Sequence, residues 1–103
     1  MIIEYIRYTI AEEKQPDFEA SYKRASEPLL ASAHCLAFEL THCVEERERY
    51  ILRIVWDSLE GHMQGFRGSS EFRHFFSHIR PYVNDIEEMQ HYELTPVVGQ
   101  KNS

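Results

Sequence analysis

Residues 35–56 read CLAFELTHCVEERERYILRIVW, and this stretch decides how the rest of the chain is interpreted. Hydrophobic residues alternate with other residues on both sides of the charged run Glu45–Glu48, which is typical of strands that bury one face. A connection this short is too short for a crossover, so the two strands are predicted to form an antiparallel hairpin with a solvated turn.

Two more strands are predicted at the ends of the chain. Residues 2–10 alternate between an apolar and a mixed face and are rich in β-branched and aromatic residues. Residues 86–94 alternate in the same way but are more polar, and this strand is expected to stop before Pro96.

A first helix is predicted between the N-terminal strand and the hairpin. Pro16 followed by Asp17 is typical of a helix start, because proline suits the first helical position and an acid complements the helix dipole. Pro28 removes a backbone donor, so the helix is expected to kink or stop near Ser26.

A second helical region is predicted after the hairpin, in two pieces. Asp57 precedes Glu60 at the spacing of a capping box, and glycines at 65 and 68 are expected to interrupt the helix. Serines 69 and 70 can cap a new helix, which is expected to end at Pro81.

These elements follow the order β-α-β-β-α-β, which predicts an α+β ferredoxin-like domain over residues 1–95 with a tail at 96–103. Both helices would then cover one face of an antiparallel sheet. The opposite face is also predicted to carry apolar residues, namely Ile3, Tyr5, Ile51, Val55 and Met89. A second copy of the chain is expected to cover that face, which predicts a homodimer.

Composition excludes several classes of partner. The net charge is -6 with acidic and basic residues interleaved, so neither nucleic acid nor an anionic membrane surface is an expected partner. No apolar run approaches the ~20 residues that span a bilayer. Cys35 and Cys43 lie too far apart along one strand to bridge, and free thiols suit a cytoplasmic protein.

Aromatic residues suggest a pocket between the sheet and the helices. Trp56, the only tryptophan, ends a strand where the chain turns into the second helical region. It can pack in the core or line the mouth of a cavity. The other residues predicted to line such a pocket are Tyr8, Phe38, Phe66, Phe72, Phe76 and Tyr92, with His62 and His74 as polar groups.

Six histidines raise the question of a metal site. His74 and His78 have the i, i+4 spacing that places two imidazoles on one face of a helix. No glutamate stands between them in a metalloprotease arrangement, and the neighbouring phenylalanines already define the buried stripe. Solvated histidines are therefore expected, and no metal site is predicted.

Three sequence features resemble the antibiotic biosynthesis monooxygenase family of dimeric α+β barrel proteins. They are the run Trp56-Asp57-Ser58-Leu59-Glu60-Gly61-His62, the step Ser70-Glu71-Phe72, and the closing strand with His91-Tyr92. The resemblance implies a homodimer with a pocket in each subunit. It also implies oxygenation of aromatic or quinol-like substrates without a metal or flavin.

Related barrels degrade haem and provide a second hypothesis. Their pattern has a tryptophan at the end of the third strand, which Trp56 matches, and an asparagine on the first strand, which residues 5–8 lack. Phe76 occupies the position expected for the proximal histidine, although haem binding through His74 stays open.

The leading hypothesis is therefore a small monooxygenase that needs no cofactor. His62 or His74 would act as the base, while Trp56, Tyr8 and Tyr92 orient the substrate ring. The alternatives are a haem-binding protein and a non-catalytic dimer that binds a small molecule in the same cavity.

Overall fold

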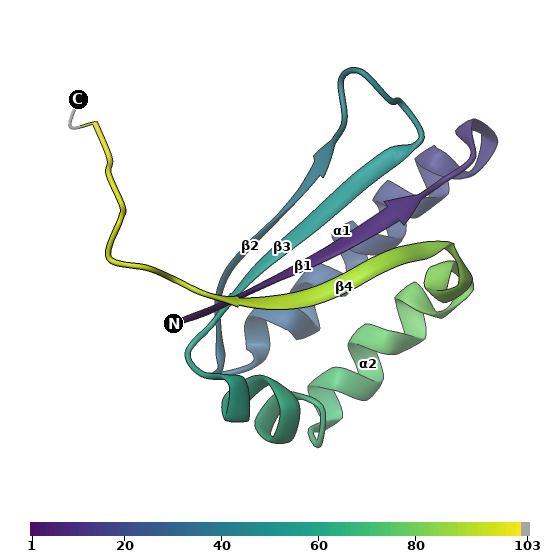
Figure 1. Ribbon diagram of the computed structural model, residues 1–103. Helices are drawn as coiled ribbons and strands as arrows, with labels where there is room; N and C mark the ends of the chain where they lie inside the picture. The colour runs from purple at the N-terminus through teal and green to yellow at the C-terminus, as the bar shows by residue number, and fades with distance from the viewer. Residues whose placement is uncertain (102–103) are drawn as a thin grey trace.

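The computed structural model describes residues 1–101 and consists of one antiparallel sheet covered on one face by helices. The strands lie in the order β2-β3-β1-β4, and Figure 1 shows this sheet in front of the helices. The predicted ferredoxin-like α+β fold is confirmed. Its main elements are β1 (Ile2–Thr9), α1 (Gln15–Ala31), β2 (Cys35–His42), β3 (Arg49–Trp56), α2 (Ser70–Ile79) and β4 (Ile86–Glu93). Shorter helical segments are η1 (Glu12–Lys14), η2 (Gly61–Phe66) and η3 (Arg80–Asp85).

Of the two outcomes predicted near Ser26, a kink or a stop, the stop is wrong, because helix α1 continues through Pro28 to Ala31. A proline in this position removes one hydrogen bond close to the end of the helix. Pro28 and Leu29 are both buried, and their packing offsets that loss. Tertiary contacts therefore extend the helix beyond the point where local preferences would end it.

The second helical region has two pieces, as predicted, but its first cap differs from the prediction. The side chain of Ser58, rather than Asp57, accepts a hydrogen bond from the backbone N–H of Gly61 at 2.8 Å. The second piece begins at the predicted serine cap, where Ser69 accepts from the N–H of Phe72 at 3.2 Å. Segment η2 is a π-helix, in which the backbone N–H of Arg67 donates a hydrogen bond to the carbonyl of His62, five residues earlier. Such wide turns occur often at functional sites.

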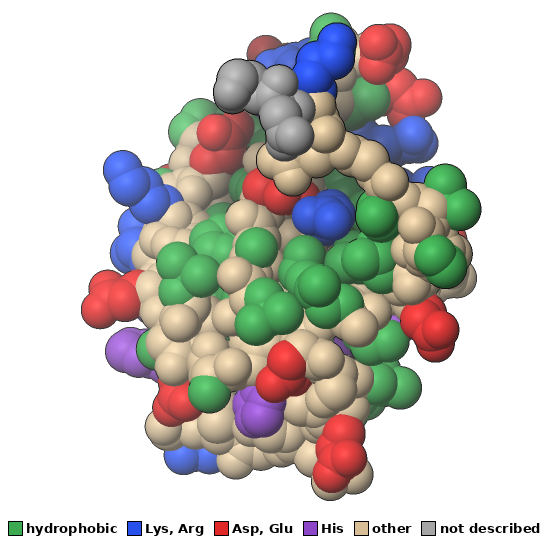
Figure 2. Space-filling model, turned by 90° about the vertical axis from the view of Figure 1, so that its left-hand side faces the viewer, with side chains coloured by type: hydrophobic (Ala, Val, Ile, Leu, Met, Phe, Trp, Pro, Cys, Tyr) green, Lys and Arg blue, Asp and Glu red, His purple; other side chains and the backbone are tan. Residues whose placement is uncertain are grey.

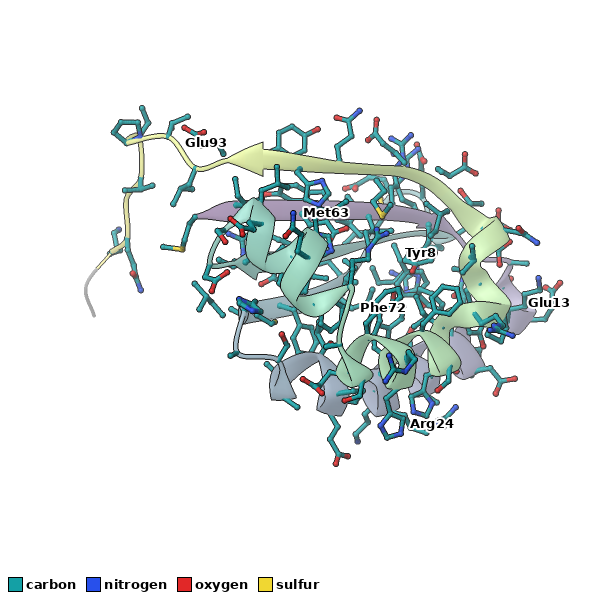
Figure 3. All side chains as sticks on the ribbon, turned by 90° about the horizontal axis from the view of Figure 1, so that it is seen from below. Tyr8, Glu13, Arg24, Met63, Phe72 and Glu93 are labelled. Carbon is teal, nitrogen blue, oxygen red and sulfur yellow. The ribbon has the colours of Figure 1, made fainter. Side chains whose placement is uncertain are left out.

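The hydrophobic core lies between the sheet and the helices. Figure 3 shows Tyr8 and Phe72 in this layer and Arg24 on the outer side of the helices. The largest fully buried side chains include Trp56, Tyr8, Tyr50 and Phe18. Aromatic rings meet edge to face here, as between Tyr8 and Phe18 with centroids 4.9 Å apart.

An irregularity in β4 changes which residues face the helices. Arg7 pairs with Glu88 but Tyr8 pairs with Ile86, so one residue of β4 is unpaired between them. A single extra residue reverses the alternation of a strand. Met89 therefore lies opposite Ile6 on the helix-covered face, and its predicted place on the open face is wrong.

The open face of the sheet carries the other apolar residues that were predicted there. Ile3 and Val55 are nearly buried among neighbouring side chains, whereas Tyr5 is 37% exposed. Tyr5 packs edge to face against Tyr92, with centroids 5.4 Å apart. Within residues 1–101, nothing covers this surface.

The ends of the molecule also expose hydrophobic side chains. Figure 2 views the end near the N-terminus and shows hydrophobic groups gathered in the middle, with charged groups around them. Beyond β4 the described tail extends away from the body, with Val97 and Val98 exposed, while predicted tail residues 102–103 lie outside the described part. Among residues 1–101, no helix combines the length and apolar character needed to cross a membrane.

Candidate functional site

A cavity of about 170 Å³ lies between the sheet and the second helical region. Its wall is mostly aromatic and aliphatic, with polar groups grouped at one end. The lining residues are Glu4, Ile6, Tyr8, Ile54, Trp56, His62, Phe66, Arg67, Phe72, Phe75, Phe76, Ile79, Val83, Ile86 and Met89. An apolar cavity with a few polar side chains is typical of a small-molecule site.

Most of the residues predicted for the pocket lie around this cavity. They come from four elements that the fold brings together. The predicted residues found in the wall are Tyr8 from β1, Trp56 from β3, His62 and Phe66 from η2, and Phe72 and Phe76 from α2.

Three predicted residues lie elsewhere. Phe38 is partly buried against the core but does not line the cavity. Tyr92 faces the open side of the sheet because the irregularity in β4 reverses its direction. His74 is exposed on the outer face of α2, where its ring stacks on that of His78 at 5.7 Å. The candidate base is therefore reduced to His62, and the haem hypothesis loses the histidine on which it rested.

The polar end of the cavity is built from four side chains. Glu4 on β1 is 2% exposed, and its Oε1 accepts a hydrogen bond from Nε1 of Trp56 at 3.0 Å. The ring of His62 stacks on the indole of Trp56, with centroids 4.3 Å apart and planes 11° from parallel. Nδ1 of His62 lies 2.8 Å from Nε2 of His91, at hydrogen-bonding distance. The carboxylate, the indole and the two imidazoles thus form one connected cluster.

Burial controls the protonation of this cluster. It raises the pKa of Glu4, although the hydrogen bond from Trp56 and the charge of Arg67 act against this. Burial also lowers the pKa of His62 to about 4, and the pKa of His91 is lowered by burial and by Arg67. Both imidazoles are therefore neutral near pH 7. The 3.5 Å approach of His62 Nε2 to Glu4 Oε1 is then a polar contact and not an ion pair.

Arg67 brings positive charge to the same end of the cavity. It lies at the end of η2, and its guanidinium stands over the ring of Phe72, 5.6 Å from the centroid. A cation held against an aromatic face in a partly buried site can stabilise negative charge that develops nearby.

The prediction from sequence missed Glu4, His91 and Arg67 as site residues. A signal existed for Glu4, because it is the one charged residue in the otherwise apolar alternation Ile2, Glu4, Ile6, Tyr8, Ile10. An acid at an inward position needs a partner, and that partner is often functional. His91 had no such signal, because its direction depends on the irregularity in β4.

Close packing against His34, in the turn that precedes β2, fixes the position of η2. The ring of His34 occupies a notch along this segment, so that a Cβ added to Gly65 would come within 2.3 Å of His34 Nε2. His34 Nδ1 also lies 3.0 Å from Oδ2 of Asp57, the residue that follows β3. These contacts hold His62 at the polar end of the cavity.

The fold and the cavity define a ferredoxin-like α+β protein with an internal aromatic site. The model of the family described as antibiotic biosynthesis monooxygenase matches residues 1–77. The chain belongs to this family. It is also 27% identical over 93 residues to the uncharacterized protein YczJ of Bacillus subtilis (strain 168), covering 90% of this chain and 98% of that protein.

Solved structures support the same fold. A Bordetella bronchiseptica protein that carries the family's name superimposes with a TM-score of 0.75 at 23% identity, covering 91% of this chain and 96% of that one. A conserved protein of Methanosarcina mazei Go1 gives a TM-score of 0.74 at 18% identity, with 91% and 92% covered. At these identities the likeness concerns the fold alone.

Proposed function

We propose that the protein is a small monooxygenase that oxidises an aromatic, quinol-like substrate with dioxygen and without a cofactor. One observation carries the proposal: Glu4 and His62, two buried side chains able to exchange protons, stand at the end of a cavity walled by aromatic rings. Membership of the antibiotic biosynthesis monooxygenase family supports it.

The size of the cavity suggests a substrate with one ring. A cavity of about 150 Å³ lined by apolar side chains holds a benzene molecule, and the volume here is about 170 Å³. Phe66, Phe72 and Trp56 would contact the faces and edges of that ring. Monocyclic phenols and hydroquinones are therefore the proposed substrate class.

The first chemical step is removal of a proton from the substrate. With its own proton on Nδ1 donated towards His91, His62 has a free electron pair on Nε2 to accept the substrate's proton. Glu4, 3.5 Å away, would stabilise the imidazolium, and Arg67 would stabilise the phenolate. Because His91 is 25% exposed, it would pass the proton towards solvent.

Dioxygen is the only oxidant that the reaction needs. The phenolate transfers an electron to dioxygen, and the resulting radicals combine through a ring carbon to form a C–O bond. The peroxide takes up a proton that returns through His91 and His62, and its O–O bond then breaks to release hydroxide, which forms water with the proton that the same carbon loses. The phenol and dioxygen become a quinone and one water molecule, so no external reductant enters.

Oxygen consumption with a panel of monocyclic phenols and hydroquinones tests this proposal. We expect uptake above the uncatalysed rate, quinone formation with the same stoichiometry, and a fall of about 10²–10⁴-fold in kcat for His62→Gln. His74→Gln is the matched control and should keep full activity, because His74 lies outside the cavity. No uptake with any member of the panel would contradict the proposal, and tight binding without turnover would identify a non-catalytic binding protein.

We also propose that two copies pair through the open faces of their sheets. Tyr5, Ile51 and Tyr92 provide apolar surface there that residues 1–101 leave uncovered. Light scattering should give twice the mass of one chain for the wild type, and the mass of a single chain for Ile51→Glu. A monomeric wild-type protein would refute this pairing without affecting the cavity.

A further inference from the structure

Glu4, His62 and His91 bring three potential ligand atoms close together, an arrangement that proton transfer alone does not require. They come from β1, η2 and β4, and each offers a ligand atom within 4.8 Å of the other two. Two imidazoles and one carboxylate are a donor set that suits divalent first-row transition metals. We propose that these three residues bind a single ion of this class, such as Zn²⁺.

The geometry of the two histidines fits such an ion. Metal–nitrogen bonds of about 2.0–2.1 Å are typical, so nitrogens 2.8 Å apart subtend close to a right angle at a shared ion, and a slight separation of the two rings would open this to the tetrahedral angle that Zn²⁺ prefers. The ion would take the place of the proton shared by Nδ1 of His62 and Nε2 of His91. Oε2 of Glu4 lies 3.8 Å from the latter nitrogen and completes the set after a small movement of the carboxylate.

Neighbouring groups already hold the ligands in place. Trp56 donates to Oε1 of Glu4, which leaves Oε2 available, and its indole supports the ring of His62 from one side. Glu4 and His91 are directly opposite each other across the β1–β4 pair, so the sheet fixes their separation. Such supporting contacts orient ligands and contribute to metal affinity. The adjoining cavity would leave a coordination position open to a small molecule.

Arg67 is the group that opposes this site, because its charge lies near all three ligands. Like charges repel strongly where solvent screening is weak. Replacing Arg67 by methionine should therefore tighten metal binding. Because the ion would bind Nδ1 of His62 and leave the proton of the ring on Nε2, it would also inhibit the proposed oxygenation, and this consequence alone rests on the proposed function.

Binding can be measured on chelator-treated protein without any substrate. Co²⁺ should quench the emission of Trp56, the only tryptophan, and give visible absorption bands at one ion per chain. Zn²⁺ should reverse both signals by competition. His91→Ala and Glu4→Gln should weaken binding about tenfold or more, with far-ultraviolet circular dichroism confirming that each variant is folded.

A double variant, His74→Ala/His78→Ala, serves as the control because it removes the exposed histidine pair on α2. It should bind Co²⁺ with unchanged affinity and quench Trp56 equally. Loss of binding in this variant, unchanged binding in His91→Ala, or absence of Trp56 quenching in the wild type would each overturn the metal site. None of these results depends on oxygen uptake, so the two proposals fail separately.

Discussion

The two faces of the sheet use alternate residues of the same strands for different purposes. On the helix-covered face, Glu4 and His62 are almost fully buried and are connected through Trp56 and His91. On the open face, Arg53 reaches Glu39 at 3.4 Å in a pair that water still contacts. A polar group is costly to bury and weakly coupled when exposed. The proposed chemistry therefore lies on one face, and the proposed pairing of two copies uses the other.

The largest difference between the faces should be the stability lost when an aromatic residue is removed from each. Trp56→Ala removes a fully buried side chain and leaves Glu4 without its donor, so we expect a loss of about 3–5 kcal/mol in the free energy of unfolding. The side chain of Tyr92 is 46% exposed, so Tyr92→Ala should lower the free energy of unfolding by clearly less. Urea denaturation at one protein concentration measures the free energy of unfolding of both variants, and equal losses would contradict the expected difference between the two faces.

The buried tyrosines on the covered side of the sheet should make stability depend on alkaline pH. Burial raises the pKa of Tyr8 to about 12 and also raises the pKa of Tyr22 well above its ordinary value, and their hydroxyl groups share a hydrogen bond. Between pH 10 and 12 the unfolded chain loses protons that the folded chain retains, so stability falls as the pH rises.

Each buried tyrosine contributes a slope of up to about 1.4 kcal/mol per pH unit. Tyr8→Phe should remove one such contribution and so reduce the slope. Urea denaturation at several pH values above 10 provides the measurement. An identical slope in the wild type and in Tyr8→Phe would show that the buried pair does not titrate as described.

A smaller effect is expected where η2 closes the covered face. Gly65→Ala brings a Cβ into the ring of His34 and should cost about 1 kcal/mol, since overpacking outweighs the better helix propensity of alanine. In a His34→Ala background the same change should be neutral or stabilising. Gly99→Ala is the control, because nothing lies within 4 Å of its added Cβ. Additive effects of the two changes would contradict the contact.

The smallest effect concerns thiol reactivity and leaves stability unchanged. Burial raises the pKa of Cys35 to about 11, so little thiolate forms at pH 8. Cys43, which is only partly buried, should react first with a disulfide reagent. One rapid equivalent per chain is expected in the folded protein and two after denaturation, and Cys43→Ser should abolish the rapid phase.

Much of the site could be predicted because it lies at the ends of regular elements. Trp56 and His62 follow from the end of a strand and the start of a helical segment, and both positions depend on local sequence. His74 was misplaced in the pocket although the phenylalanine stripe on the same helix already indicated that this histidine would be solvated, as it is. Tyr92 and Met89 were misplaced because a single unpaired residue in β4 reverses its alternation, and the sequence contains no mark of it.

The sequence by itself determined the order of the elements, the hairpin and one apolar face, because hydrophobic periodicity and turn residues act over short distances. Only the tertiary structure decided that Glu4, His62 and His91 meet. Their convergence depends on the pairing of β1 with β4 and on the packing of η2 against His34, which are contacts between distant segments. The strength of a buried polar cluster arises from that convergence, since each side chain alone would be costly to bury.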